Sequence, residues 1–225
     1  MRLVSVNVGV VRPLPPDGAP TGIDKRPVGG PVTVSAPGPR GSVALDGDEV
    51  ADARHHGGAD QAVYAYARED LDEWGRDLGR ELPDGVFGEN LTTLGVDVTG
   101  ALIGERWRVG PDVVLEVSRP RIPCATFAAR MGERDWVGRF TAAAVPGAYL
   151  RVVSPGEIRP GDRIEIVHRP GHDVTIGVTF RAMTLEPDLL PLLLRADALP
   201  EPIRDRARRR SGGADGPVTV VPTDD

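Results

Sequence analysis

Hydrophobic residues alternate with polar or small ones over several short stretches, which is the pattern of half-buried β-strands. At the amino end, valines occupy every second position from Val4 to Val10, with Ser5 and Asn7 between them. Short apolar runs predict further strands over the ranges 32–35, 42–45, 62–66, 107–109, 113–117, 148–153 and 163–167. Glycine and proline mark the connections, and 13–20 is predicted as a loop. The pattern favours a mainly β fold with tight turns.

Helical periodicity occurs at fewer places. In the range 68–79, Leu71, Trp74 and Leu78 share one face and a glycine follows as a stop signal, which predicts an amphipathic helix. The stretch 173–183 fits a strand or a helix equally well from its residues. Further helices are predicted over 125–131, 133–144, 189–199 and 202–210.

Length and composition narrow the class of protein. The 225 residues suffice for one domain with an appendage, or for two small domains, with a core that needs no disulfides. The net charge of -6 argues against a nucleic-acid partner, and no apolar stretch reaches the ~20 residues of a membrane helix. The single cysteine fits a reducing compartment, and the amino end has no signal-peptide core. We expect a cytoplasmic protein with no membrane partner.

The single cysteine, Cys124, ends the sequence Arg-Pro-Arg-Ile-Pro-Cys. Pro120 and Pro123 lack N–H groups, so the strand before them is predicted to stop there, and the helix 125–131 begins directly after Cys124. Free backbone N–H groups at a helix start, with two arginines just upstream, favour a thiolate over a thiol. A lone cysteine is also commonly a small buried hydrophobe. Both interpretations stay open from the residues alone.

Two other stretches carry candidate binding residues. The turn Thr21-Gly-Ile-Asp-Lys-Arg places Lys25 beside Arg26, which suits either a solvated surface or a phosphate site. His55 and His56 precede two glycines, but no zinc-type ligand spacing accompanies them. His56 is therefore either held near a ligand or simply part of a turn.

A third stretch, Gly88-Glu-Asn90, places Glu89 and Asn90 beside a glycine, where a backbone can approach a ligand closely. The chain contains no signature for a flavin, haem or iron–sulfur cluster, because one cysteine cannot hold a cluster and no G-x-G-x-x-G occurs.

Five motifs follow one another along the first 170 residues: Thr21-Gly-Ile-Asp-Lys25, His56-Gly-Gly58, Phe87-Gly-Glu-Asn90-Leu-Thr-Thr, Arg121-Ile-Pro-Cys124, and Tyr149-Leu-Arg-Val-Val-Ser-Pro-Gly-Glu-Ile-Arg-Pro-Gly-Asp162. In this order they resemble the MOSC domain proteins, a family named for the C-terminal domain of molybdenum cofactor sulfurase. Gly22 departs from the pattern, since serine or alanine is expected there.

The resemblance implies a β-barrel-like MOSC domain with inserted helices over 1–170 and a small three-helix segment over 171–210, so 176–183 is expected to be helical. The polar residues 211–225 are predicted to be disordered. The resemblance also implies that the molybdenum cofactor binds this chain and that Cys124 supplies a thiolate to the molybdenum. The cofactor-binding residues that it implies are Thr21, Lys25, Arg26, His56, Glu89, Asn90, Arg121 and Cys124.

The resemblance further implies a molybdenum-dependent oxidoreductase that removes oxygen from N-hydroxylated bases, amidoximes or hydroxylamines. Cys124 and His56 are the expected catalytic residues, with His56 and Glu89 as candidates for supplying protons. Electrons are expected from a separate reductase, a flavoprotein. Two alternatives stay open: a non-catalytic carrier of the cofactor or of sulfur, with a persulfide or metal at Cys124, and a structural barrel in which this thiol is inert.

Overall fold

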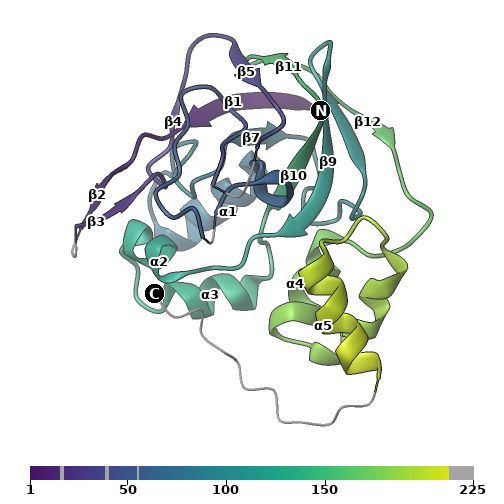
Figure 1. The fold of residues 1–225 in the computed structure, drawn as a ribbon. Helices are drawn as coiled ribbons and strands as arrows, with labels where there is room; N and C mark the ends of the chain where they lie inside the picture. The colour runs from purple at the N-terminus through teal and green to yellow at the C-terminus, as the bar shows by residue number, and fades with distance from the viewer. Residues whose placement is uncertain (16–17, 39–40, 55, 213–225) are drawn as a thin grey trace.

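The computed structural model describes residues 1–15, 18–38, 41–54 and 56–212. A curved mixed sheet with strand order β12-β8-β9-β10-β6-β7-β1-β4 forms its centre (Figure 1). Its strands are β1 (Arg2–Val8), β4 (Arg26–Pro27), β6 (Val63–Ala67), β7 (Leu91–Leu94), β8 (Arg106–Val109), β9 (Val113–Pro120), β10 (Ala148–Ser154) and β12 (Ile164–His168). Two smaller sheets pair β2 (Arg12–Leu14) with β3 (Ala19–Thr21), and β5 (Val32–Val34) with β11 (Gly156–Ile158).

The main sheet curls back on itself at the amino end of β1. Arg2 forms an isolated antiparallel bridge with Arg163, directly before β12. Beside it, the N–H of Leu3 donates to the carbonyl of Asp162 at 2.8 Å. This seam consists of a few bonds rather than a continuous ladder, so the described strands form a barrel-like sheet and not a closed barrel. The predicted mainly β, barrel-like fold is confirmed.

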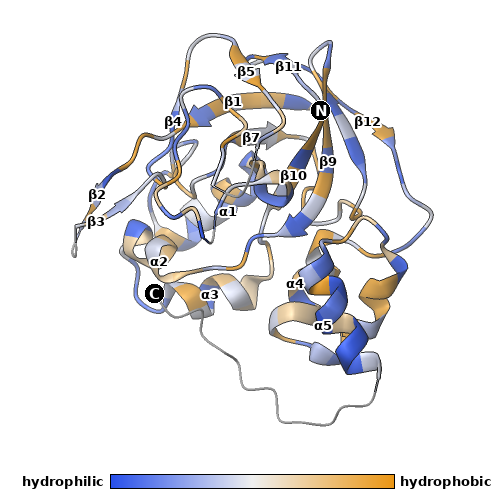
Figure 2. Cartoon of the chain, viewed as in Figure 1, coloured by the Kyte–Doolittle hydropathy of each residue, from blue (hydrophilic) through white to orange (hydrophobic). Residues whose placement is uncertain are grey.

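Strand β6 lies between two hydrophobic clusters. Val63 and Ala65 face the cluster inside the curved sheet, whereas Tyr64 and Tyr66 face an aromatic cluster on its other side. This second cluster lies under α1 (Arg68–Leu78), α2 (Ala125–Met131) and α3 (Trp136–Ala143). Its other aromatic members are Trp74, Phe87, Phe127, Trp136 and Phe140. The alternation along β6 therefore fixes one pair of tyrosines against the helical layer. Hydrophobic and hydrophilic residues are mixed along the strands of the main sheet (Figure 2).

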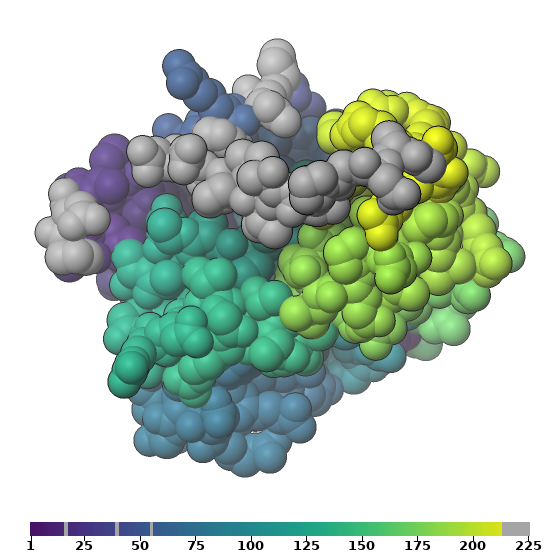
Figure 3. All heavy atoms as spheres, turned by 90° about the horizontal axis from the view of Figure 1, so that it is seen from below, coloured from purple at the N-terminus to yellow at the C-terminus, as the bar shows by residue number. Residues whose placement is uncertain are grey.

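The C-terminal segment contains α4 (Ile176–Thr184), the 3-10 helix η2 (Pro187–Arg195) and α5 (Glu201–Ser211). They form one group beside the α2–α3 segment (Figure 3), and the rings of Phe140 and Phe180 lie 6.5 Å apart. The hydroxyl of Thr175 caps α4 by accepting from the N–H of Val178 at 3.0 Å. The expected three-helix segment is confirmed. Of the predicted tail 211–225, Ser211 belongs to α5, and the residues from 213 on lie outside the described ranges.

Four details of the sequence prediction are wrong. Strand β9 continues to Pro120, which pairs with Ala148; a proline at the last residue of a strand interrupts no further ladder bonds. The range 42–45 is not a strand, since only Leu45 bridges to Val34. The loop 13–20 instead contains parts of the β2–β3 hairpin. The helix predicted over 189–199 exists but has other bounds: it is the 3-10 helix η2, Pro187–Arg195, in which Pro191 lacks a backbone N–H.

Strand β1 also differs from its predicted half-buried pattern, because the polar residues between the valines are buried. Ser5 donates to the side-chain oxygen of Asn7 at 2.6 Å, and the side-chain nitrogen of Asn7 donates to Thr92 Oγ1 at 3.1 Å. Hydrogen bonding compensates for their loss of water. This polar face of β1 meets the loop that leads into β7.

That loop, 83–90, is held by the carboxylate of Glu89, which is fully buried. Its oxygens accept from the N–H of Gly85 at 2.5 Å, the N–H of Phe87 at 3.0 Å and Thr92 Oγ1 at 3.1 Å. Burial raises the pKa of Glu89 from 4.5 to about 7, against the opposing effect of these hydrogen bonds. Glu89 therefore supports the loop from inside.

The raised pKa of Glu89 predicts a pH-dependent stability. The native state binds this proton more tightly than the unfolded state, so the stabilisation is fully present below about pH 4.5 and is lost as the pH rises through about 7. The size is on the order of 3 kcal/mol, from 1.36 kcal/mol per pKa unit. We expect the unfolding free energy of wild type, minus that of Glu89→Gln, to fall between pH 4.5 and 8 in urea titrations. A difference that stays flat or rises with pH would contradict the raised pKa.

Candidate functional site

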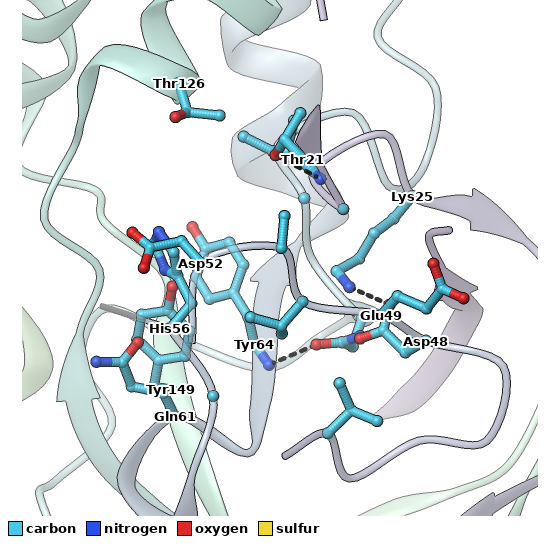
Figure 4. Close-up of a pocket in the computed structure, with 18 of the residues that line it drawn as sticks. Thr21, Lys25, Asp48, Glu49, Asp52, His56, Gln61, Tyr64, Thr126 and Tyr149 are labelled. Atoms are coloured by element: carbon cyan, nitrogen blue, oxygen red, sulfur yellow. Dashed lines mark hydrogen bonds and ion pairs between the residues drawn. The ribbon is translucent and has the colours of Figure 1, made fainter. Parts of the chain in front are cut away.

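A pocket opens where segments far apart in the sequence meet (Figure 4). Its walls come from the Thr21–Lys25 turn, the 42–64 segment, the Gly88–Asn90 loop, the start of α2 and strand β10. The expected site residues that line it are Thr21, Lys25, His56, Asn90, Arg121 and Cys124. The fold thus brings together residues from four of the sequence motifs, and the fifth contributes Tyr149.

A buried ion pair lies on one side of the pocket. The side chains of Lys25 and Asp48 are only 10% and 6% exposed, and the ammonium donates to Asp48 Oδ1. Asp48 also accepts from the N–H of Gly9 at 2.9 Å and from the amide of Asn90 at 2.9 Å. Burial lowers the pKa of Lys25, while the attraction of Asp48 opposes this effect. An ammonium has three donors, so Lys25 keeps donors beyond the one that Asp48 uses.

Asn90 lines the pocket, and its side-chain amide is hydrogen-bonded within the fold. Its amide nitrogen donates to Asp48 at 2.9 Å and to the carbonyl of Asn7 at 3.3 Å, which uses both N–H donors. Its side-chain oxygen accepts from the N–H of Tyr64 at 3.1 Å. Asn90 therefore ties β1, β6 and the Asp48 loop together next to the pocket.

Arg121 is buried beside the pocket, after the end of β9. Its guanidinium carbon lies 3.9 Å from the centre of the Phe127 ring and 5.2 Å from that of Tyr64, and Nη1 donates to the carbonyl of Phe87. Stacking on aromatic faces and a backbone hydrogen bond hold the group in place. A fixed positive charge therefore lies at this wall of the pocket.

Cys124 directly precedes α2 as its N-cap residue, and its side chain makes no capping hydrogen bond. The thiol is half-buried, lines the pocket and interacts electrostatically with Arg121 and Tyr149. Within the described residues, no three His, Cys, Asp or Glu side chains gather in a way that would hold a metal ion. The thiol of Cys124 and the two buried cations, Lys25 and Arg121, thus line the same pocket.

His56 reaches the pocket from the opposite side. Figure 4 shows it with Asp52, Gln61 and Tyr149, across from Lys25 and Asp48. Two glycines with positive φ follow it; a Cβ on Gly57 would lie 2.8 Å from the carbonyl of Ser42, so the chain needs glycine to pass there. His55 lies outside the described residues.

Two expected site residues do not line the pocket. Arg26 has a 70% exposed side chain whose Nη2 lies 3.0 Å from Asp24 Oδ2, so it belongs to the surface. The carboxylate of Glu89 faces its own loop, with the three donors described above. Both departures arise because neighbours in sequence point to different sides of the backbone.

Sequence reasoning missed Asp48 and Tyr149 as pocket residues. Asp48 follows the pair Asp46-Gly47, which indicates only a turn. Nothing in this local pattern identifies Asp48 as the partner of Lys25. Tyr149 was noted only as part of a motif. An acidic residue in a turn is only a weak signal of an ion pair with a lysine elsewhere in the chain, because the pairing depends on tertiary contacts.

In the part of the chain that the structure describes, no helix has the length and apolar character to cross a membrane.

Comparison with known proteins places this geometry in a family. The family model of the MOSC domain matches residues 52–165, which include His56, Arg121 and Cys124. The protein YflK of Bacillus subtilis (strain 168) is 33% identical over 176 residues, covering 77% of this chain and 76% of the relative. A protein of Gibberella moniliformis (strain M3125 / FGSC 7600) named "Reductase" is 32% identical, covering 85% of this chain but 34% of its own length.

Among solved structures, the crystal structure of YiiM from Geobacillus stearothermophilus is similar with a TM-score of 0.75 and 27% identity. The match covers 93% of this chain and 98% of that one. Motif order, fold and family model agree, and the chain belongs to the MOSC domain family.

Proposed function

We propose that the pocket binds the molybdenum cofactor and that the chain uses it to reduce N-hydroxylated compounds. The observation that carries this proposal is the meeting of Cys124, Arg121 and Lys25 in one pocket of a MOSC chain. One soft sulfur donor suits a metal whose other sulfur ligands come from an organic cofactor. Two buried cations suit the anionic part of such a cofactor.

The backbone around the pocket supports the same fit. Gly88 has a φ of +77°, and a Cβ there would lie 2.9 Å from Ile23 Cγ1 and 3.8 Å from Arg121 Nη1. Glycine thus lets the loop before β7, the Thr21–Lys25 turn and the guanidinium come close together. Gly88 and Arg121 therefore lie together in the pocket lining, where a ligand would meet both the loop and the cation.

Each pocket residue then has a role. Cys124 binds the metal, Lys25 and Thr21 hold the anionic end of the cofactor, and Arg121 donates hydrogen bonds to its polar edge. When bound, the cofactor supplies two-electron chemistry that takes the oxygen from an N–OH group. Two electrons and two protons convert N–OH into N–H and water. His56, at the pocket wall, is placed to give a proton to the departing oxygen.

The electrons come from another protein in this proposal, because the sequence carries no flavin, haem or iron–sulfur signature. The donor is a flavoprotein reductase. The printed name of the Gibberella relative, "Reductase", supports the reaction class, although the matched part is 34% of that protein.

Removal of the thiol tests the metal ligand. In a cofactor-producing host, Cys124→Ala should lose nearly all of its molybdenum, since the substitution deletes the proposed protein ligand. The fold should persist because the thiol makes no capping bond and is only half-buried. Metal analysis and circular dichroism of purified protein measure both. Wild-type molybdenum content in a folded Cys124→Ala protein would exclude the ligand role.

Removal of the buried cation tests the anion site. Lys25→Met should weaken cofactor retention by about 1–3 kcal/mol, the size of a hydrogen bond to a charged group. It also leaves Asp48 buried without its partner, which lowers stability.

The matched control is the double variant Lys25→Met/Asp48→Asn, which removes both charges. The double variant should regain much of the melting temperature that Lys25→Met loses, but it should not regain cofactor retention. Retention is measured as the release of pterin during dialysis. If cofactor retention returns together with stability, Lys25 acts on the fold and not on the cofactor.

Turnover tests the reaction. Cofactor-loaded protein, given electrons by reduced methyl viologen, should convert benzamidoxime to benzamidine, and apo-protein should not. Product is measured by chromatography. A loaded protein that retains its cofactor but forms no benzamidine, nor any amine from a hydroxylamine, would instead be a carrier of the cofactor.

A further inference from the structure

The three tyrosines of the chain differ in how their hydroxyl groups are used. Tyr64 donates to the carbonyl of Pro146 at 2.8 Å. Tyr66 donates to the carbonyl of Val145 at 2.8 Å and accepts from the indole N–H of Trp74 at 3.1 Å. The hydroxyl of Tyr149 makes no hydrogen bond to any residue in the described ranges. Two of these groups thus support the fold, and the third does not.

Tyr149 nevertheless has a fixed position. It lies in β10, paired with Tyr64 of β6 on one side and Arg119 of β9 on the other. Its ring is tilted against that of Tyr64, with 5.1 Å between the ring centres. Neighbouring strands on both sides hold the residue, so its side chain is presented to the pocket from a rigid part of the fold.

Within the pocket, Tyr149 lies away from Lys25 and Asp48 but close enough to Arg121 to interact with it electrostatically. Figure 4 shows it beside His56 and Gln61, across from Lys25 and Asp48. It also interacts electrostatically with Cys124. With the cofactor held between the cations and the thiol, the region next to Tyr149 and His56 is the part of the pocket that a substrate would enter.

The hydroxyl is suited to donate a hydrogen bond there. A phenol has an ordinary pKa of about 10, so it keeps its proton at physiological pH. Tyr149 is half-buried, and a hydroxyl that lines the pocket without a partner among the described residues is available to a ligand bound there. An oxygen atom on the substrate is such a partner.

We propose that Tyr149 is a substrate-contacting residue whose hydroxyl donates a hydrogen bond to the oxygen of the N–OH group. This inference rests on the proposed function. The contact exists with the N-hydroxylated substrate and is absent with the product, which lacks that oxygen. Tyr149 therefore makes the pocket prefer substrate over product and favours product release.

The test uses two ligands that differ by the oxygen and, because an amidine is protonated at neutral pH, by one positive charge. The readout is therefore the change that the substitution causes in the affinity of each ligand. Cofactor-loaded, oxidised protein without reductant is titrated calorimetrically with benzamidoxime and with benzamidine. We expect Tyr149→Phe to bind benzamidoxime about three- to tenfold more weakly, the equivalent of one net hydrogen bond. Its affinity for benzamidine and its melting temperature should match the wild type, because the hydroxyl has no partner to lose among the residues that the structure describes.

Tyr66→Phe is the matched control, since its hydroxyl is buried, bonded and outside the pocket lining. It should melt earlier and keep the wild-type ratio of the two affinities. The inference is overturned if Tyr149→Phe keeps that ratio, whether it leaves both affinities unchanged or weakens both equally. A different result would contradict the proposed function itself: cofactor-loaded wild-type protein would bind benzamidoxime but form no benzamidine when reduced methyl viologen is added.

Discussion

The buried ion pair of Lys25 and Asp48 is the interaction on which the pocket depends. Placing two charges out of water is costly unless both are well paired and hydrogen-bonded. Asp48 meets this condition by accepting from Lys25, from the N–H of Gly9 and from Asn90. Asn90 passes the constraint on to β1 and β6. The carboxylate of Asp48 thus holds its own loop next to three other segments, which contain Gly9, Lys25 and Asn90. Without this carboxylate, the ammonium of Lys25 would be buried without a counter-charge.

A second constraint comes from the aromatic layer under α1, α2 and α3. It supports Arg121, which lies over Phe127 and is tied to the carbonyl of Phe87. Tightly packed rings leave few alternative positions for this guanidinium, so its charge faces the pocket without reorganisation when a ligand arrives. The lysine and the arginine are therefore held in two unlike ways, one by a counter-charge and one by stacking. The thiol of Cys124, three residues after Arg121, lines the same pocket as these two cations.

The sequence predicted the class of fold and most of the pocket, and its failures have physical causes. Strand periodicity and the order of motifs were enough for the barrel-like sheet, and Cys124, Arg121, Lys25 and His56 all line the pocket. Local pattern carries no information about partners far along the chain. For this reason the sequence did not reveal Asp48 as the partner of Lys25, nor the bonds from the amide of Asn90 to Asn7 and Asp48. The direction in which a side chain points also depends on the folded surroundings. The sequence therefore did not show that the carboxylate of Glu89 points into its own loop.

The central claim is that one pocket holds a molybdenum cofactor between Cys124 and Lys25. A crystal structure of the cofactor-loaded protein, with anomalous data collected at the molybdenum edge, tests it most directly. The account predicts a molybdenum peak at bonding distance from the sulfur of Cys124, with the anionic end of the pterin next to Lys25. A molybdenum peak away from this thiol, or a pterin that reaches neither Lys25 nor Arg121, would contradict it.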